Sequence, residues 1–165
     1  MKPRNWTRPK TWVLPLTYKP KIPACKAGTI CQTIRPHWKM RPGDTILFHD
    51  WAGKPYYSKW NWRARVNVTE AHPVWIYPEW FERLEWSPRR GCFVAVPYSW
   101  SSKVADELAA KDGIDPPTGK ALGELLCKMH DLRKKDNLFS PTHFRDIEFQ
   151  VIRWKNWHEE VKVVA

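Results

Sequence analysis

The chain has 165 residues, 42% of them hydrophobic, which is enough for one domain with a packed core. No apolar run approaches the roughly 18 residues of a membrane-spanning helix, and the basic N-terminus lacks the apolar segment of a secretory signal. These features predict a cytoplasmic protein without a membrane partner.

The net charge of +11 is unevenly distributed along the chain. Residues 1–41 contain ten Lys and Arg and no acidic residue, whereas the remainder has 18 basic and 17 acidic residues. A basic surface on an otherwise balanced domain is typical of a polyanion binder. A solvated basic tail is the alternative, and it applies best to the first ten residues.

The N-terminal third is predicted to begin with a flexible basic arm over residues 1–11. The domain follows over residues 12–155, and residues 156–165 form a tail or an extra strand. Residues 12–16 are expected to form an edge strand because they include Pro15.

A helical turn and a polar strand come next. Residues 22–27 are predicted to form one turn of helix that ends at Gly28. The polar run over residues 32–35 then extends as a strand.

The sequence Arg-Pro-Gly-Asp over residues 41–44 predicts a tight turn before a strand at residues 45–49. Gly43 accepts a left-handed backbone conformation without steric cost. Asp44 can accept hydrogen bonds from nearby backbone N–H groups, so we interpret it as a turn residue.

Residues 60–69 alternate apolar and polar side chains, and this alternation gives the strongest strand prediction in the chain. Trp60 and Trp62 lie on the apolar side and are expected in the core. Arg63 and Arg65 lie on the other face, which is basic.

The C-terminal half is predicted to combine strands with two helices, and the whole chain to form an α+β, mainly β domain. We expect a small, partly open β-barrel covered by the helices. The expected elements are strands at residues 73–77, 91–96 (buried) and 146–154, a short helix or loop at 78–86, a helix from Ser101 or Ser102 to Lys111, and a helix at 118–133.

Two short motifs give the chain a family resemblance. Gly28 precedes a Thr-Ile-Arg run that contains Thr33 and Arg35, and Gly43-Asp44-Thr45-Ile46 opens a strand followed by Trp51 and Gly53. Over about residues 12–154 the chain thereby resembles the ASCH domain, a member of the PUA-like β-barrel superfamily. The resemblance implies a PUA-like barrel that binds RNA or a modified base.

Some ASCH proteins are amidohydrolases of acetylcytidine, and the resemblance implies candidate catalytic residues here. Thr33 matches the family Thr, and Asp112 falls near the acidic position. The position of the family Lys holds Ile30, with Lys26 and Lys21 nearby in sequence. We therefore expect no efficient deacetylation unless one of these lysines acts as a relocated base.

Basic and aromatic residues interleave between Trp51 and Arg65, a pattern in which rings stack on unpaired bases and cations hold phosphates. We expect a cleft between residues 28–35 and 51–65. The candidate nucleic-acid-binding residues are Lys21, Lys26, Arg35, Arg41, Trp51, Tyr56, Lys59, Arg63 and Arg65.

The main hypothesis is a module that binds RNA or another single-stranded or modified nucleic acid. A hydrolase of RNA or modified nucleosides and a protein-interaction module are the alternatives. The four cysteines form no C-x-x-C pair and the six histidines show no H-E-x-x-H spacing, so we expect reduced thiols and neither metal nor cofactor. Oligomeric state does not follow from the sequence.

Overall fold

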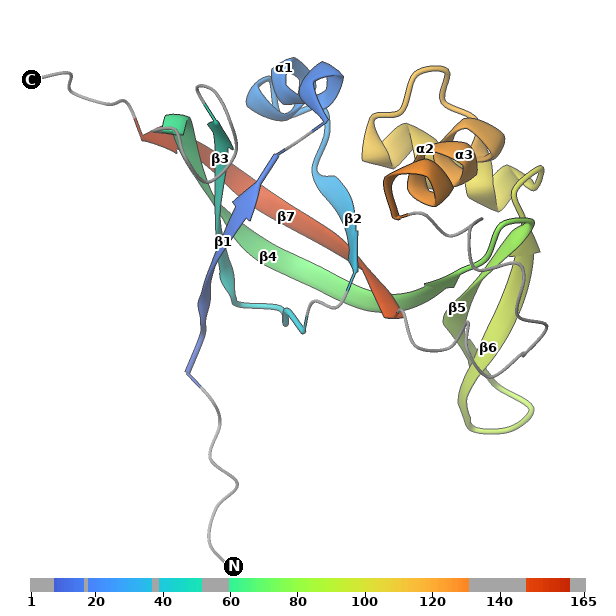
Figure 1. Ribbon diagram of the computed structural model, residues 1–165. Coiled ribbons are helices and arrows are strands. Elements are labelled where there is room, and N and C mark those ends of the chain that lie inside the picture. The colour runs from blue at the N-terminus through green and yellow to red at the C-terminus, as the bar shows by residue number, and fades with distance from the viewer. Residues whose placement is uncertain (1–7, 17, 37–38, 52–59, 131–147, 161–165) are drawn as a thin grey trace, which may run out of the picture.

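A single mixed β-sheet dominates the fold. The computed structural model describes residues 8–16, 18–36, 39–51, 60–130 and 148–160. Within these residues seven strands form the sheet, and three α-helices and a short 3₁₀-helix accompany it (Figure 1). The α+β, mainly β class predicted from the sequence is confirmed at this level.

Two long antiparallel strands, β4 and β7, form the spine of the sheet. β4 (Trp60–Ile76) and β7 (Glu148–Glu160) pair along most of their length. β3 (Thr45–Trp51) pairs with the first half of β4, and β5 (Trp80–Ser87) pairs with its last residues. β2 (Gln32–Pro36) pairs with the other edge of β7, so β7 separates β2 from β4.

The sheet stays open and does not close into a barrel. β1 (Thr11–Pro15) pairs parallel with β3, at the sheet edge as predicted. β6 (Cys92–Ser99) ends the other side by pairing with β5. Among the described residues no strand pairing joins β1 to β2, so the barrel predicted from the sequence is an open, curved sheet.

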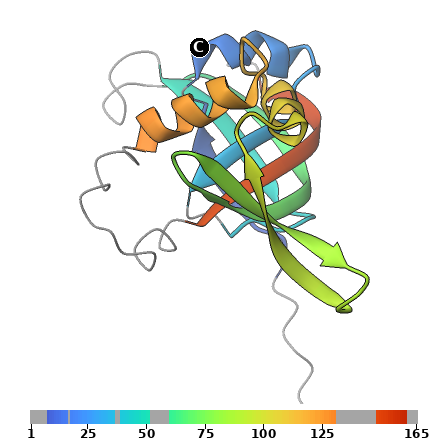
Figure 2. The same ribbon diagram turned by 90° about the vertical axis from the view of Figure 1, so that its right-hand side faces the viewer.

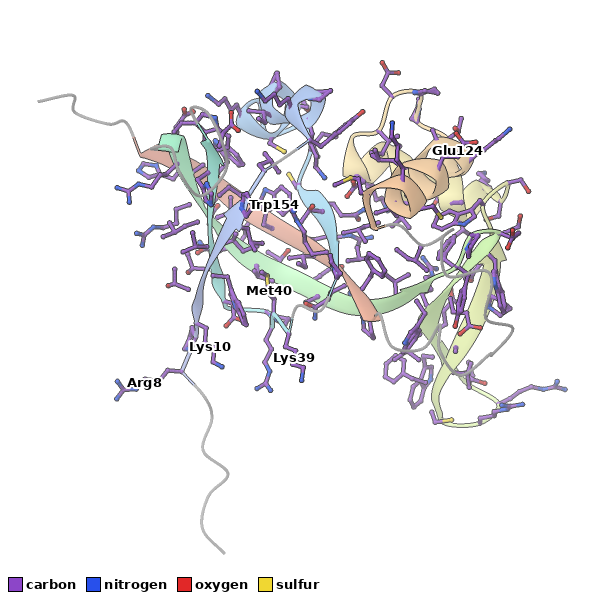
Figure 3. The ribbon with its side chains drawn as sticks, viewed as in Figure 1. Arg8, Lys10, Lys39, Met40, Glu124 and Trp154 are labelled. Carbon is purple, nitrogen blue, oxygen red and sulfur yellow. The ribbon has the colours of Figure 1, made fainter. Side chains whose placement is uncertain are left out.

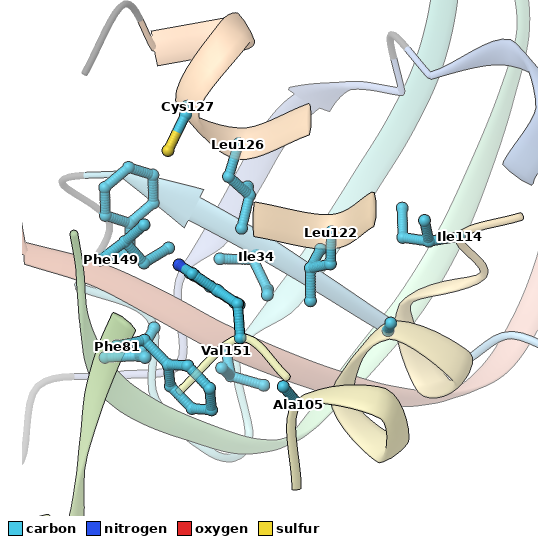
Figure 4. Packing of buried hydrophobic residues seen from close by; sticks show 13 residues of the cluster. Ile34, Phe81, Ala105, Ile114, Leu122, Leu126, Cys127, Phe149 and Val151 are labelled. Carbon is cyan, nitrogen blue, oxygen red and sulfur yellow. The ribbon is translucent and has the colours of Figure 1, made fainter. Parts of the chain in front are cut away.

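One apolar cluster fills the space between the sheet and two helices, α2 (Lys103–Asp112) and α3 (Gly119–His130). Leu122 and Leu126 of α3 lie over Ile34 of β2 (Figure 4). An added Cβ at Gly123 would lie 2.7 Å from the Trp100 ring, so glycine allows α3 to approach this closely. The apolar side of α3 that the sequence predicted is therefore the side that contacts β2.

A second apolar cluster lies among β1, β3, β4 and β7, and it includes Leu14, Ile46 and Phe48. Ala64, Val66 and Val68 of β4 are buried, as the alternation predicted, and Trp62 is half-buried against this cluster. The side chain of Trp60 lies outside the described residues.

The helix ends follow their sequence signals. The Ser102 hydroxyl accepts a hydrogen bond from the Ala105 N–H (3.2 Å), and Gly113, whose φ is +73°, caps the C-terminal end of α2. α1 (Ile22–Lys26) ends before Gly28 as predicted, and a 3₁₀-helix, η1 (Lys19–Lys21), precedes it. None of the helices in the described ranges is long and apolar enough to cross a membrane.

The turn before β3 is tied to the N-terminal segment. Gly43 has a φ of +93°, and the Asp44 carboxylate accepts hydrogen bonds from the backbone N–H groups of Lys10 and Arg41 and from the indole N–H of Trp12. Burial alone would raise the pKa of Asp44, but these bonds outweigh it and the pKa is lowered. Lys10 therefore belongs to the folded structure, although the sequence placed it in a flexible arm.

Three other predictions about the elements are wrong. Residues 73–76 of the strand predicted at 73–77 continue β4 instead of forming a separate strand, and residues 78–86, expected as a helix or loop, contribute most of β5. Residues 91–96 form most of β6, but this strand is largely exposed because it pairs only with β5. Residues 156–160, for which the sequence left a tail or an extra strand open, extend β7.

Candidate ligand pocket

A small cavity of about 60 Å³ lies beside β2, at the point where η1 and helices α2 and α3 meet it. Its polar wall consists of Lys21, Thr33, Arg35 and Asp112. Lys21 ends η1, Thr33 and Arg35 alternate along β2, and Asp112 ends α2. The rest of the wall is apolar apart from the Tyr18 hydroxyl and comprises Leu16, Tyr18, Ile34, Ile114, Leu122, Leu125, Leu126 and Met129.

An ion pair lies at the polar wall of this cavity. Lys21 Nζ is 3.1 Å from Asp112 Oδ1, and the two side chains are only 3% and 10% exposed. The contact does not have the alignment of a hydrogen bond, because Asp112 Oδ1 has no hydrogen-bond partner among the described residues. Burying two charges is costly, and their mutual attraction compensates only when both partners are present.

Burial shifts the pKa values of the charged groups in the pocket. It lowers the pKa of Lys21 below its ordinary value, and the neighbouring Asp112 offsets only part of that effect. It raises the pKa of Asp112, against the opposing effects of Lys21 and Arg35. Burial also lowers the pKa of Arg35, but a guanidinium stays protonated in proteins. When all three groups are ionised, two cations surround one carboxylate and the pocket is net positive.

Asp112 occupies an electrostatically unfavourable position in its own helix. The C-terminal end of a helix carries partial negative charge and favours cations. An acidic residue at this point of α2 therefore depends on cations from elsewhere, which Lys21 and Arg35 supply. This arrangement holds a carboxylate in the pocket that the helix alone would disfavour.

A chain of polar contacts fixes the strand behind the carboxylate. The Arg153 guanidinium donates to the Gln32 side-chain oxygen (3.0 Å) and to Glu70 (2.7 Å). The Gln32 amide donates in turn to the Leu108 carbonyl of α2 (3.3 Å). Gln32 is buried, so this contact ties β2 to α2 next to Asp112.

Arg35 has a structural bond as well as a place in the pocket. Its Nη2 donates to the Pro15 carbonyl (2.7 Å) and so connects β2 to the end of β1 across the open side of the sheet. Its Nε is buried and has no hydrogen-bond partner among the described residues. The sequence predicted Arg35 as a ligand-binding residue, and the structure shows that one edge of the guanidinium also secures the sheet.

Thr33 and Arg35 line the same cavity, as expected for alternate residues of one strand. The opposite side of the strand also is buried, since Gln32 and Ile34 are both covered. The whole of β2 is enclosed because α2 and α3 lie on it.

Lys26 does not reach the pocket, contrary to its selection as a catalytic candidate. Its ammonium pairs with Glu159 (2.9 Å) and lies 5.2 Å from the centre of the Trp62 ring, at the surface. Lys21 enters the pocket in its place. Five residues along a helical path turn a side chain by more than a quarter turn, so both lysines could not face the same cavity.

The expected cleft between residues 28–35 and 51–65 does not form between the described strands β2 and β4, and its residues 52–59 lie outside the described part of the chain. β7 lies between β2 and β4, so it separates the two segments. Arg63 and Arg65 lie on the side of β4 opposite Ala64 and Val66, away from the pocket. Arg41 is exposed in its turn, Tyr56 and Lys59 lie outside the described residues, and of Trp51 only the backbone is described.

Of a cluster of four exposed basic residues, only Arg41 was singled out from the sequence as a candidate binding residue. Arg8 and Lys10 precede β1, and Lys39 and Arg41 precede β3, so they gather at one end of the sheet (Figure 3). We call these four residues the basic end. The only signal for it was the absence of acidic residues before position 42.

Metal binding and thiol chemistry have no support in the described part of the chain. It contains no group of three His, Cys, Asp or Glu residues that could hold a metal ion. Cys25 and Cys127 are buried, and burial raises the pKa of Cys25 to about 11, so this thiol stays protonated. Cys31 and Cys92 are exposed free thiols.

Comparisons with known proteins do not assign the chain to a family. A scan against protein-family models, a search of curated proteins and a search of solved structures find no match.

The pocket predicts an asymmetric response to removal of its charges. Asp112→Asn leaves two buried cations without a carboxylate and should lower the free energy of unfolding by roughly 3–5 kcal/mol, as expected for a broken buried pair. Lys21→Met should cost less, because Asp112 keeps the nearby Arg35. Urea unfolding of both single variants and of the double variant measures these effects.

The double variant should lose less stability than the sum of the single variants, because it removes both members of the pair. Additive losses, or a larger loss for Lys21→Met than for Asp112→Asn, would contradict this description of the pocket.

Proposed function

We propose that this chain is an ASCH-type, PUA-like module that binds RNA or another single-stranded or modified nucleic acid. The observation that carries the proposal is the net positive pocket formed by Lys21, Arg35 and Asp112. Such a site attracts an oxygen that carries full or partial negative charge. Two residues of the family motif, Thr33 and Arg35, contribute to it.

The size of the cavity limits what it can hold. A cavity of about 150 Å³ accommodates a benzene ring, and this one has only about 60 Å³. It therefore suits a small oxygen-bearing group of a nucleotide, such as an acyl substituent, and not a whole base. Met129 is the most exposed residue of its wall, at 48%, so the route inward is expected beside the end of α3.

The basic end provides a second positively charged surface for a nucleic acid, outside the pocket. Its four cations belong to a stretch without acidic residues other than Asp44, which is buried and hydrogen-bonded. Exposed Lys and Arg of this kind hold phosphates without selecting a sequence. The nucleic-acid backbone is thus expected to contact this end of the sheet.

Binding should show the salt dependence of phosphate contacts. We expect the affinity for a fluorescein-labelled single-stranded RNA to fall linearly with salt on a log–log scale. Replacing Arg8, Lys10 and Lys39 together by Gln should lower that slope by roughly 2, since each phosphate contact contributes about 0.7. Fluorescence anisotropy over a salt series measures the slope.

A matched triple variant on the helices, with Lys103, Lys120 and Lys128 changed to Gln, controls for total charge, because these lysines are also exposed. It should leave the slope unchanged. Equal effects of the two triple variants would contradict a localised basic end, and absence of RNA binding at low salt would overturn the proposed function.

A second candidate function, amide hydrolysis on a modified nucleoside, is favoured by one specific observation. Lys21, Thr33 and Asp112 line the same cavity, so an ammonium reaches the pocket although Ile30 stands at the family's Lys position. Ile30 instead packs against the segment that follows Asp112, about 3 Å from where a Cβ on Gly113 would lie. Lys21 is thus a candidate for the relocated base.

The lowered pKa of Lys21 suits this chemistry, because only the neutral amine can accept a proton. Neutral Lys21 would take a proton from water, and the hydroxide oxygen would add to the amide carbon. The C–N bond would then break, and Lys21 would return the proton to the leaving nitrogen. Arg35 would stabilise the oxyanion, and Thr33 would orient the water or the substrate.

This candidate predicts release of cytidine from acetylcytidine at a rate that rises with pH, as Lys21 loses its proton. Lys21→Met and Thr33→Val should abolish the release, whereas Lys26→Met, which changes the surface lysine, should not affect it. Chromatography of the products measures the rate. If no cytidine is released, the hydrolase function is excluded for this substrate and binding alone remains. If Lys21→Met keeps full activity, Lys21 is not the base and the proposed mechanism is wrong.

A further inference from the structure

The β5–β6 hairpin exposes an aromatic face that the sequence predicted to be buried or irregular. The hairpin extends away from the rest of the domain (Figures 1 and 2). Trp86 is 56% exposed and Phe93 is 63% exposed, although both are large apolar residues. Exposed aromatic residues gathered on one face of a strand pair mark an interaction surface.

Strand register brings these rings together. Trp86 lies directly opposite Phe93, and their ring centres are 5.4 Å apart in an edge-to-face arrangement. Leu84 and Trp80 lie on the same side of β5 as Trp86 and are also exposed, with the half-buried Glu82 between them. We call the side that carries these four residues the aromatic face.

The opposite side of the hairpin is anchored to the domain. Phe81 is fully buried, stacks on Tyr98 and lies 4.8 Å from the ring centre of Trp100. Arg83 pairs with Glu85 (2.7 Å), and the Tyr98 hydroxyl also donates to Glu85. The root of the hairpin is therefore fixed, and the exposed rings near its tip contribute little to the core.

The charge near the tip indicates what the aromatic face binds. The turn holds two exposed arginines, Arg89 and Arg90, next to the Trp86–Phe93 pair. From Trp86 to Ala105 the sequence contains no acidic residue. Flat apolar rings beside the two arginines of the tip match the alternating bases and phosphates of a single-stranded nucleic acid, and the acidic residues of the hairpin, Glu82 and Glu85, precede this tip.

We propose that the β5–β6 hairpin is a docking site for single-stranded RNA, in which unpaired bases stack on Trp86 and Phe93 while Arg89 and Arg90 hold the adjacent phosphates. This inference rests on the proposed nucleic-acid-binding function, and it assigns part of that function to a surface outside the pocket and the basic end. Stacking accepts any base, so the hairpin provides affinity without sequence selectivity. Selection of a particular nucleotide substituent is then the role of the pocket.

The test uses the full chain and a fluorescein-labelled oligouridine. Trp86→Ala with Phe93→Ala should weaken binding by about tenfold or more without changing the salt slope, because stacking is not ionic. Arg89→Gln with Arg90→Gln should lower the slope by roughly 1.4, because two phosphate contacts are lost. Trp86→Tyr with Phe93→Tyr should restore binding, since tyrosine also stacks.

Leu84→Ala is the matched control, because it removes apolar surface from the same face without removing a ring. It should change the affinity less than twofold. Thermal unfolding of every variant should match that of the unchanged chain, because the altered side chains are exposed.

The outcomes separate this inference from the proposed function. If the unchanged chain binds RNA and the Trp86→Ala, Phe93→Ala variant binds it equally well, the hairpin assignment is wrong and the proposed function stands. If the unchanged chain binds no RNA at low salt, both fail. If it instead dimerises and the variant does not, the aromatic face contacts a second copy of the chain and the assignment to RNA is overturned.

Discussion

The buried pairing of Lys21 with Asp112 is the interaction on which the candidate pocket depends. It joins two segments far apart in sequence, the 3₁₀-helix before α1 and the last residue of α2. Removing either charge is costly, because an isolated buried charge costs several kcal/mol, although Asp112 also has Arg35 nearby. The helices and β2 must therefore keep the spacing that makes the cavity.

Arg35 distinguishes this site from a purely structural ion pair. One carboxylate between two cations leaves the enclosed site net positive, and one guanidinium nitrogen, Nε, has no hydrogen-bond partner among the described residues. A structural pair alone would be satisfied by a single cation. The second cation, Arg35, exceeds what one carboxylate needs for neutralisation. It therefore favours the binding of an anionic or carbonyl oxygen from a ligand. The same residue holds β1 to β2 through the Pro15 carbonyl, so site and open sheet are linked.

Much of the fold could be predicted from local patterns. The alternation in residues 60–69, the Gly43–Asp44 turn and the amphipathic helix near Leu122 each follow from rules that act within a few residues. Thr33, Arg35 and Asp112 were selected from motif spacing, and they do line one cavity. The sequence was less informative wherever the outcome depends on which elements become neighbours.

Two features illustrate that limit. Lys21 and Lys26 are equivalent in sequence, and only the packing of η1 against α2 makes one a buried pocket residue and the other a surface residue. The Trp-rich segment of β5 and the apolar run of β6 have the composition of buried elements. They form an exposed hairpin because each strand pairs with the other and only the root reaches the core.

The most direct test of the central claim is the ionisation of Lys21 in the free and bound protein. Heteronuclear NMR of the side-chain amines, assigned with a Lys21→Arg variant, would follow its titration. We expect the pKa of Lys21 to lie below the ordinary value of 10.5 in the free chain and to rise when RNA binds, because a ligand oxygen favours the ammonium. A Lys21 that titrates at the ordinary value and does not respond to bound RNA would contradict the central claim.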